Sequence, residues 1–382
     1  MHQPKSTRPD GRKEIVRITI VQGAFLPVPP LRGGAIEKAW QGLGEAFVKA
    51  GHEVTHISRL CDGLPRNEKI RGVFHIRVTG AEATTQPVGL KLRELLYVLR
   101  VRKILPPADI LVTNAFWAPI IYPKEKYGKL YVHVGRFPKG QMKFYNKATR
   151  LQAPSQSVGR AISAELSELD DRVRCIPYPL PDFEPHEFPI YDRPKRVLYA
   201  GRIHPEKGVL ELVQAWLRLP EEIKQKWALR LVGPWRKDQG GGGSRYLQKI
   251  RDIGGSNVEI QEPIFDQKIL SEEYKNAQVF VYPSMARRGE TFGLAVLEAM
   301  NCGCVPVVSP LDCFQDFVLP GKNGIFLDQN EKNLVTGLVK TLQNVLLSCP
   351  LDEWSKQAYL TTQKYEMGLI AERFLDDFRA II

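Results

Sequence analysis

The stretch from Pro283 to Pro310 constrains the fold more than any other part of this sequence, because it reads as a loop, a helix and a buried strand in close succession. Thr291 is expected to cap the helix, and apolar residues follow it at helical spacing. The segment Val305–Val308 is short and almost wholly apolar, as in a parallel-sheet strand covered on both faces. The stretch therefore predicts an α/β fold with a parallel sheet.

The junction of this loop and helix combines a glycine with two carboxylates. Gly293 stands where the helix begins, and a residue without Cβ lets an anionic ligand approach the free N–H groups there. Glu290 precedes the helix and Glu298 lies about two turns along it. Because carboxylates accept hydrogen bonds from sugar or ribose hydroxyls, the junction suits a ligand with a phosphate and hydroxyls. The alternative is that both glutamates are solvated helix charges.

The string from Glu290 to Leu294, with Glu298-Ala299-Met300 and Pro306-Val307-Val308 after it, resembles the donor signature of retaining glycosyltransferases of family 4. The resemblance implies the GT-B fold, an α/β architecture of two Rossmann-like, doubly wound parallel-sheet domains that face each other across a cleft. It also implies that Glu298 holds the nucleotide ribose. Glu290 and a short run of backbone would position the donor sugar, and that run comprises Phe292, Gly293, Leu294 and Ala295. The side chains of Phe292 and Met300 are expected in the core.

A second motif, GRIHPEKG, spans residues 201–208 between a predicted strand at 196–200 and a helix. Arg202 can grip two oxygens and Lys207 supplies a mobile point charge, so this turn suits a diphosphate. For either residue alone, an ordinary surface charge is the alternative. Together they match the family's G-R-x4-K-G signature, which implies that both stabilise the departing diphosphate. Ile264 matches the place where family members contact the nucleotide base.

Two features of the first half add to the expected site. Gly33-Gly34 separates a strand at 15–21 from a helix that Gly51 closes, and it is either a plain turn or, as the resemblance implies, part of the donor-binding loop. His133 lies near the end of a strand at 130–134, and such ends point into the ligand crevice of an open parallel sheet. A satisfied core histidine is the alternative. The resemblance implies that His133 touches the donor sugar near its reacting carbon.

The length of 382 residues predicts two domains. Six prolines between Pro177 and Pro194 indicate a linker. We therefore expect an acceptor-side domain at 1–180 and a nucleotide-sugar domain at 181–366, with a final helix at 367–382 that packs back on the first. The start of the chain is polar and basic without an apolar core, so we expect a leader that is not a secretory signal.

Charge is divided unevenly between the halves. Residues 1–180 hold 29 Lys and Arg against 15 Asp and Glu, which gives +14, whereas the remainder holds 25 against 27, or −2. The basic half suits an anionic membrane or acceptor, and nucleic acid is not expected because no aromatic-interleaved basic stripe occurs. The stretch at 90–105 predicts a helix rich in leucine and basic residues. Its leucines either pack on the sheet, which we favour, or lie in a membrane interface.

No metal or cofactor is implied, since the sequence has no D-x-D pair and its seven histidines show no ligand spacing. Six scattered cysteines favour reduced, mostly buried thiols in a cytoplasmic protein.

The resemblance to family 4 implies a retaining glycosyltransferase of class EC 2.4 with a nucleotide-diphosphate sugar as donor and a saccharide or lipid-linked acceptor. Cell-surface polysaccharide, lipopolysaccharide or glycolipid synthesis is the expected setting, in the cytoplasm and peripherally on the inner face of the membrane. The expected catalytic residues are His133, Glu290, Arg202 and Lys207. A GT-B nucleotide-sugar epimerase and a non-catalytic nucleotide-sugar-binding protein are the alternatives.

Overall fold

The computed structural model describes residues 15–84, 86–122, 125–181, 190–328 and 333–382. The chain forms two compact units: unit 1 is residues 1–154, Val158–Pro179 and Met367–Ile382, and unit 2 is Ser155–Ser157 and Leu180–Glu366. The division therefore lies one residue from the expected position at 180, and the final helix belongs to unit 1. The expected leader and residues 182–189 of the proline-rich linker lie outside the described residues.

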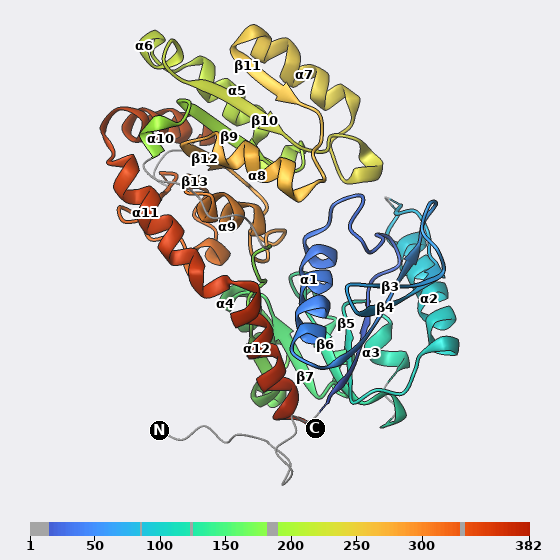
Figure 1. Ribbon diagram of the computed structural model, residues 1–382. Helices are drawn as coiled ribbons and strands as arrows, with labels where there is room; N and C mark the ends of the chain where they lie inside the picture. Colours follow the sequence, from blue (N-terminus) through green and yellow to red (C-terminus); the bar gives the residue numbers. More distant parts are fainter. Residues whose placement is uncertain (1–14, 85, 123–124, 182–189, 329–332) are drawn as a thin grey trace, which may run out of the picture. The chain divides into compact units, whose positions relative to one another are not determined.

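Unit 1 is built on an eight-stranded sheet that is parallel apart from one edge strand. Figure 1 labels its strands β3 to β7. Its order is β3 (Asn67–Ile70), β4 (Val73–Thr79), β2 (Glu53–Leu60), β1 (Arg17–Val21), β5 (Ile110–Thr113), β6 (Lys129–His133), β7 (Arg150–Ala153) and β8 (Val173–Cys175). The antiparallel edge strand β3 was not predicted, because its sequence NEKI is short and largely polar.

Helices cover both faces of this sheet, which makes unit 1 doubly wound. On one face, α1 (Ala35–Lys49) and α12 (Met367–Arg379) build a core with Trp40, Phe47, Phe374 and Phe378. On the other face, α2 (Pro87–Ile104), α3 (Ala118–Ile121) and α4 (Gln156–Glu165) cover a second core. The apolar strands of unit 1 thus lose water on both sides.

Helix α2 corrects one expectation. The predicted inward face of Leu92, Leu96 and Leu99 is exposed, and the sheet is covered instead by Tyr97, Val98 and Val101. The prediction that these leucines pack on the sheet was therefore wrong. Helix α2 carries apolar residues on two faces, and the face with β-branched and aromatic residues packs inward.

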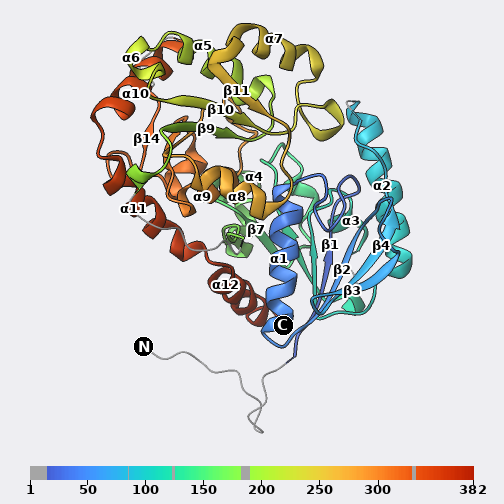
Figure 2. The ribbon, with the colours of Figure 1, turned by 45° about the horizontal axis from the view of Figure 1, so that its top comes forward.

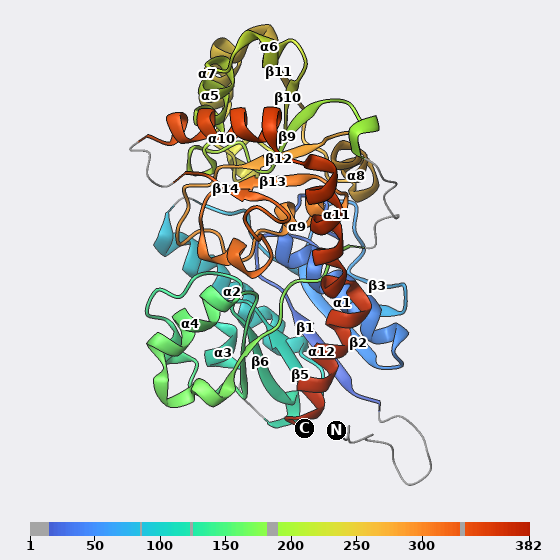
Figure 3. The ribbon, with the colours of Figure 1, turned by 90° about the vertical axis from the view of Figure 1, so that its left-hand side faces the viewer.

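Unit 2 has a six-stranded parallel sheet. Its order is β11 (Val258–Gln261), β10 (Ala228–Val232), β9 (Arg196–Ala200), β12 (Val279–Tyr282), β13 (Val305–Val308) and β14 (Ile325–Phe326). The helices are α5 (Val209–Leu217), α6 (Glu221–Lys224), α7 (Ser244–Gly254), α8 (Gln267–Lys275), α9 (Leu294–Asn301), α10 (Leu334–Ser348) and α11 (Leu351–Thr362). Helices α5 and α7 lie beside each other (Figure 3).

The strand order reverses once in each sheet, between β1 and β5 in unit 1 and between β9 and β12 in unit 2. Loops that leave two neighbouring strands in opposite directions open a crevice at the carboxyl edge, where α/β proteins bind ligands. The two reversals therefore mark where each unit can hold a ligand.

No single helix in the described part of the chain is long and apolar enough to cross a membrane, although the bent pair Leu334–Ser348 and Leu351–Arg379 passes such a test jointly. The six cysteines are free thiols, of which Cys302, Cys304 and Cys313 are buried and the other three half-buried.

A buried carboxylate ties α12 to the sheet of unit 1. Asp377 accepts a hydrogen bond from the Tyr131 hydroxyl at 2.9 Å and pairs with Arg150 at 3.0 Å. Both partners of the ion pair are buried. The charge of Arg150 is therefore compensated only while α12 stays in place.

We expect Asp377→Ala to lower the free energy of unfolding by about 3 kcal/mol, because it leaves Arg150 buried without its partner. Urea denaturation measures the change. The matched control is Asp376→Ala, which removes an exposed pair with Arg379 and should change stability by less than about 0.5 kcal/mol. Equal effects of the two substitutions would contradict the argument.

A second stability prediction concerns two buried histidines on neighbouring strands. His56 of β2 stacks on His75 of β4 with ring centroids 5.4 Å apart. Burial lowers the pKa of His75 to about 4 and that of His56 well below its ordinary value, and the charge of Arg77 adds to the lowering of both. Folding thus keeps both rings neutral where the unfolded chain would be protonated.

Both histidines stabilise the fold above pH 6.5 and lose this contribution in acid, and for His75 the loss amounts to about 2 kcal/mol at pH 5. Glu37 acts in the opposite direction, since its pKa is raised to about 7. We therefore expect thermal melting to show a smaller acid loss in His75→Phe than in the wild type. An acid loss of the same size in both proteins would refute the assignment.

Candidate active site

The turn after β9 and the turn after β12 meet at the strand-order reversal of unit 2. The Met285 N–H donates to the Glu206 carbonyl at 2.8 Å, which joins the two turns. Gly208 has φ 69°, and a Cβ there would lie 2.2 Å from the Pro283 carbonyl oxygen, so only glycine permits this approach. The two motifs found in the sequence are therefore parts of one structure.

Lys207 and Glu290 form a buried ion pair at the centre of this structure. The same oxygen, Glu290 Oε1, also accepts hydrogen bonds from Tyr282 Oη and Ser284 Oγ, each at 3.1 Å. Among the described residues, none donates a hydrogen bond to the other oxygen, Glu290 Oε2. The carboxylate is thus fixed by three donors through one oxygen, and its second oxygen can accept a hydrogen bond from a ligand.

Arg202 is half-exposed and already has partners. Its guanidinium donates to Glu206 Oε1 at 2.6 Å and to the Gly240 carbonyl at 2.8 Å. The Gly240–Gly243 loop is itself anchored, since Gly242 N–H donates to the Ile203 carbonyl at 2.8 Å. The backbone of this glycine-rich loop is therefore held against the turn after β9. A diphosphate that bound Arg202 would therefore compete with Glu206 for the guanidinium.

Gly293 sets the start of α9. It occupies the N-cap with φ 91°, in the left-handed region, and its Cβ position lies 2.2 Å from the buried Phe314 ring. The expected cap at Thr291 was wrong, because the chain needs a left-handed residue directly before Leu294. Phe292 and Met300 are buried in the core as predicted, and Leu294 is buried while Ala295 is only partly so.

Glu298 lies on α9, which packs against α8, and Ile264 lies in the segment before α8. Glu298 is buried on α9 and accepts a hydrogen bond from the Tyr274 hydroxyl of α8 at 3.3 Å. Ile264 is half-buried in the segment between β11 and α8. The ribose and base contacts assigned to these residues stay predictions.

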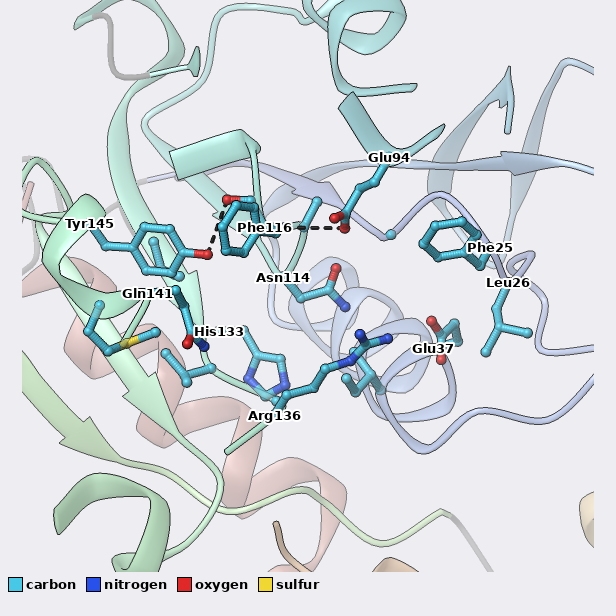
Figure 4. A pocket seen from close by; sticks show the side chains of 17 residues that line it. Phe25, Leu26, Glu37, Glu94, Asn114, Phe116, His133, Arg136, Gln141 and Tyr145 are labelled. Carbon is cyan, nitrogen blue, oxygen red and sulfur yellow. Dashed lines mark hydrogen bonds between the residues drawn. The ribbon is translucent and has the colours of Figure 1, made fainter. Parts of the chain in front are cut away.

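Unit 1 holds a pocket of about 160 Å³ at its own strand-order reversal, and Figure 4 shows the side chains that line it. The loops after β1, β5 and β6 contribute Gly23, Asn114 and Arg136, and α1 and α2 contribute Glu37 and Glu94. Aromatic walls come from Phe25, Phe116 and Tyr145. The pocket therefore combines apolar walls with groups that can accept or donate hydrogen bonds.

His133, the last residue of β6, lines this pocket but has both ring nitrogens engaged. Gln152 Nε2 donates to the Ile176 carbonyl at 2.5 Å, so Gln152 Oε1 faces Nδ1 of the imidazole, which must carry the proton. Nε2 then accepts from the Tyr178 hydroxyl at 2.8 Å. Burial lowers the pKa of His133 to about 4, so the ring is neutral. This is the arrangement of a satisfied core histidine, and its contact with a sugar stays a prediction.

Gly33 and Gly34 lead into α1 beside the pocket. Both have left-handed φ values, 76° and 109°, and Gly34 is the N-cap of α1. The buried Glu37 carboxylate folds back over Gly34, where it would lie 2.2 Å from an added Cβ. Burial raises the pKa of Glu37 to about 7, against its backbone N–H and the charge of Arg136. Gly33 and Gly34 thus form the N-terminal turn that leads into α1, and the Glu37 carboxyl group packs against Gly34.

Arg136 is the pocket's exposed cation. In Figure 4 its guanidinium lies between the Asn114 amide and the Glu37 carboxylate. Asn114 Oδ1 is buried without a recorded partner among the described residues, while its amide nitrogen donates to Gln22 at 2.8 Å. Glu94 accepts from the Phe116 N–H at 3.2 Å, and burial raises its pKa.

The sequence signals located the unit 2 site better than the unit 1 pocket. The structure joins Lys207 to Glu290 and places Arg202 on the same turn, whereas His133 and Gly34 belong to unit 1. Tyr282 and Ser284 were not predicted, although their position at the carboxyl end of a buried strand is a usable signal. Glu37 and Glu94 were not predicted because no spacing in the sequence links them.

Parts of this chain are similar in sequence to known glycosyltransferases. The model of the family described as glycosyl transferases group 1 matches residues 182–359. The O-antigen chain mannosyltransferase B of Escherichia coli is 30% identical over 42% of this chain and 38% of its own length. The lipopolysaccharide 1,2-N-acetylglucosaminetransferase of Salmonella typhimurium is 27% identical over 48% of each chain. An uncharacterized glycosyltransferase of Methanocaldococcus jannaschii is 26% identical over 92% of this chain and 95% of its own.

The chain spans only about a third to a half of the first curated relatives that it matches, between 30% and 48% of their lengths. Solved structures cover it more fully. Sucrose-phosphate synthase from Thermosynechococcus elongatus has a TM-score of 0.76 at 20% identity, over 96% of this chain and 99% of that one. A UDP-forming trehalose-phosphate synthase from Burkholderia xenovorans has a TM-score of 0.69 at 14% identity, over 96% and 99%. These likenesses show the fold, which is GT-B as predicted.

We expect Gly293→Ala to destabilise unit 2 by about 3 kcal/mol, the sum of a left-handed conformation and an overpacked Phe314. The matched control is Gly321→Ala, which has φ 74° but nothing within 4 Å of the added Cβ, and should cost about 1 kcal/mol. Chemical denaturation measures both. If the two variants are equally stable, contact with Phe314 does not require glycine at this turn.

Proposed function

We propose that this chain is a glycosyltransferase that moves a sugar from a nucleotide-diphosphate donor to an acceptor hydroxyl. The observation that carries the proposal is the ion pair of Lys207 and Glu290 at the strand-order reversal of unit 2, within the segment that matches glycosyl transferases group 1. Relatives named as mannosyl- and N-acetylglucosaminetransferases support the same chemistry.

Breaking the bond between the sugar and the diphosphate places negative charge on the leaving group. Lys207 is a buried cation whose position Glu290 fixes, and Arg202 stands on the same turn. Fixed charges in a site of low dielectric stabilise such charge without reorganising. The N-terminus of α9 at Gly293 adds backbone N–H groups. We assign to these groups the departing diphosphate, with no metal required.

The remaining roles concern the rest of the donor. Glu298 binds the ribose and Ile264 the base, while Glu290 Oε2 and the backbone from Phe292 to Ala295 orient the sugar. His133 contacts the sugar, and because Gln152 holds Nδ1, Tyr178 is the partner that a ligand would replace at Nε2. With no protein nucleophile assigned, the departing phosphate acts as base and the anomeric configuration is retained.

The unit 1 pocket is the place for the acceptor in this proposal. Glu94 and Asn114 can accept hydrogen bonds from hydroxyls, the aromatic walls can stack on a sugar ring, and Arg136 can hold an anionic group. An acceptor with a phosphate or carboxylate also suits the charge of +14 on residues 1–180. Such acceptors belong to saccharide or glycolipid synthesis in the cytoplasm beside the membrane.

We expect Lys207→Gln to lower kcat about 100-fold or more, because it keeps a hydrogen-bond donor for Glu290 but removes the charge that stabilises the leaving group. Glu298→Gln should raise KM for the donor about tenfold, since the carboxylate is the stronger acceptor for ribose hydroxyls. The control is Lys249→Ala on the exposed face of α7. A panel of nucleotide sugars with candidate acceptors, read by mass spectrometry, supplies the substrates.

The competing functions give different products in this assay. A nucleotide-sugar epimerase would convert the donor with no acceptor present, and a non-catalytic binding protein would be stabilised by the donor and form no product. Product NMR tests retention, and a chelator should leave the rate unchanged. Wild-type turnover in both Lys207→Gln and Glu298→Gln would reject the site.

A further inference from the structure

The outward face of α2 is an apolar stripe that no described element covers. Val88, Leu92, Leu96 and Leu99 recur along one side of the helix and are 81%, 56%, 46% and 39% exposed. Figure 2 shows α2 along the β4 side of the sheet in unit 1. Single exposed leucines are ordinary on a protein surface, but four apolar residues in register on one helix form a continuous patch.

Basic side chains border this stripe on both sides. At about 100° per residue, Lys91 and Arg102 lie along one edge, Arg93 and Arg100 along the other, and Lys103 near the carboxyl end of the stripe. Arg93 and Arg100 each donate to a backbone carbonyl, of Glu82 and Thr79, which holds them at the surface. Long basic side chains can lay their stems on an apolar layer and keep their charges at its rim.

On α2 and in the described segment before it, acidic groups do not balance these cations. The one acidic residue of α2, Glu94, lies on the opposite face and accepts the Phe116 N–H. Glu82, just before the helix, is already paired with Arg59 and Arg32, which hold its pKa at about 2. The outward face of α2 therefore presents apolar and positive groups together.

We propose that this face of α2 docks on an anionic membrane surface, with the helix lying in the plane of the interface and its four apolar residues between the lipid headgroups. An apolar stripe with cationic borders is complementary to such a surface in both hydrophobicity and charge. A second copy of the same face is a poorer occupant, because it would bring the two cationic borders together. The inference deepens the proposed function by naming how a lipid-linked acceptor is reached, but its evidence is independent of the reaction.

The test is sedimentation of the full chain with phosphatidylcholine vesicles that either contain or lack phosphatidylglycerol. We expect binding only to the anionic vesicles and a fall in binding as salt rises, because salt screens the charges. The double variant Leu92→Ser, Leu96→Ser should bind about tenfold more weakly or worse, and so should Arg102→Glu, Lys103→Glu. Because all four side chains are exposed, these variants should fold, which circular dichroism checks.

The matched control is Leu347→Ser, Leu360→Ser, which removes two leucines of unit 2 that are each 59% exposed and should leave binding unchanged. Equal loss in this control, or binding that ignores lipid charge and salt, would overturn the proposal. The proposal would also be overturned if the protein did not bind vesicles but formed a dimer, and if the Leu92→Ser, Leu96→Ser variant abolished that dimer. Glu298→Gln should bind vesicles like the wild type, so a failed transfer reaction and a failed membrane contact are told apart.

Discussion

The reversal of strand order beside the first strand of each sheet is the constraint on which the rest of this structure depends. Parallel strands bring all their carboxyl ends to one edge, and helices on both faces close that edge everywhere except where neighbouring connections diverge. In unit 2 this opening lies between β9 and β12, and the turns that leave those strands carry Lys207 and Glu290. In unit 1 it lies between β1 and β5, where the pocket is found.

We propose that the charges at the unit 2 opening serve a ligand more than the stability of the fold. Burying a lysine and a glutamate removes both from water, and their attraction offsets that cost only with good geometry and further hydrogen bonds. Tyr282 and Ser284 supply those bonds to one oxygen of Glu290. Two apolar side chains of similar size in place of Lys207 and Glu290 would stabilise the unit equally well or better. A fixed cation beside a carboxylate with one oxygen left for a ligand therefore favours a binding role.

Local sequence predicted the parts of the structure that local interactions determine. The strand and turn from Arg196 to Gly208 were predicted correctly, and so were the loop, helix and strand from Pro283 to Val308 apart from the helix cap, because glycine, charge and apolar runs fall at fixed offsets there. The prediction that Thr291 caps the helix was wrong. The residue before Leu294 must adopt a left-handed conformation and leave room for the Phe314 ring, and the position of that ring follows from tertiary packing. Glu37, Glu94 and Arg136 meet through three separate elements, and nothing in the spacing of single residues predicts such a meeting.

Helix α2 shows why periodicity alone cannot decide which face of a helix is buried. Its apolar residues occupy two opposite faces, so the pattern fits two orientations that differ by half a turn. The choice falls to side-chain shape, because Tyr97, Val98 and Val101 fill the space over the sheet and the Tyr122 hydroxyl donates to the Val98 carbonyl at 2.8 Å. The leucines are left outside at a cost in exposed apolar area. Contact with a lipid membrane would remove this apolar area from water. The basic residues that border the stripe favour a membrane with anionic headgroups.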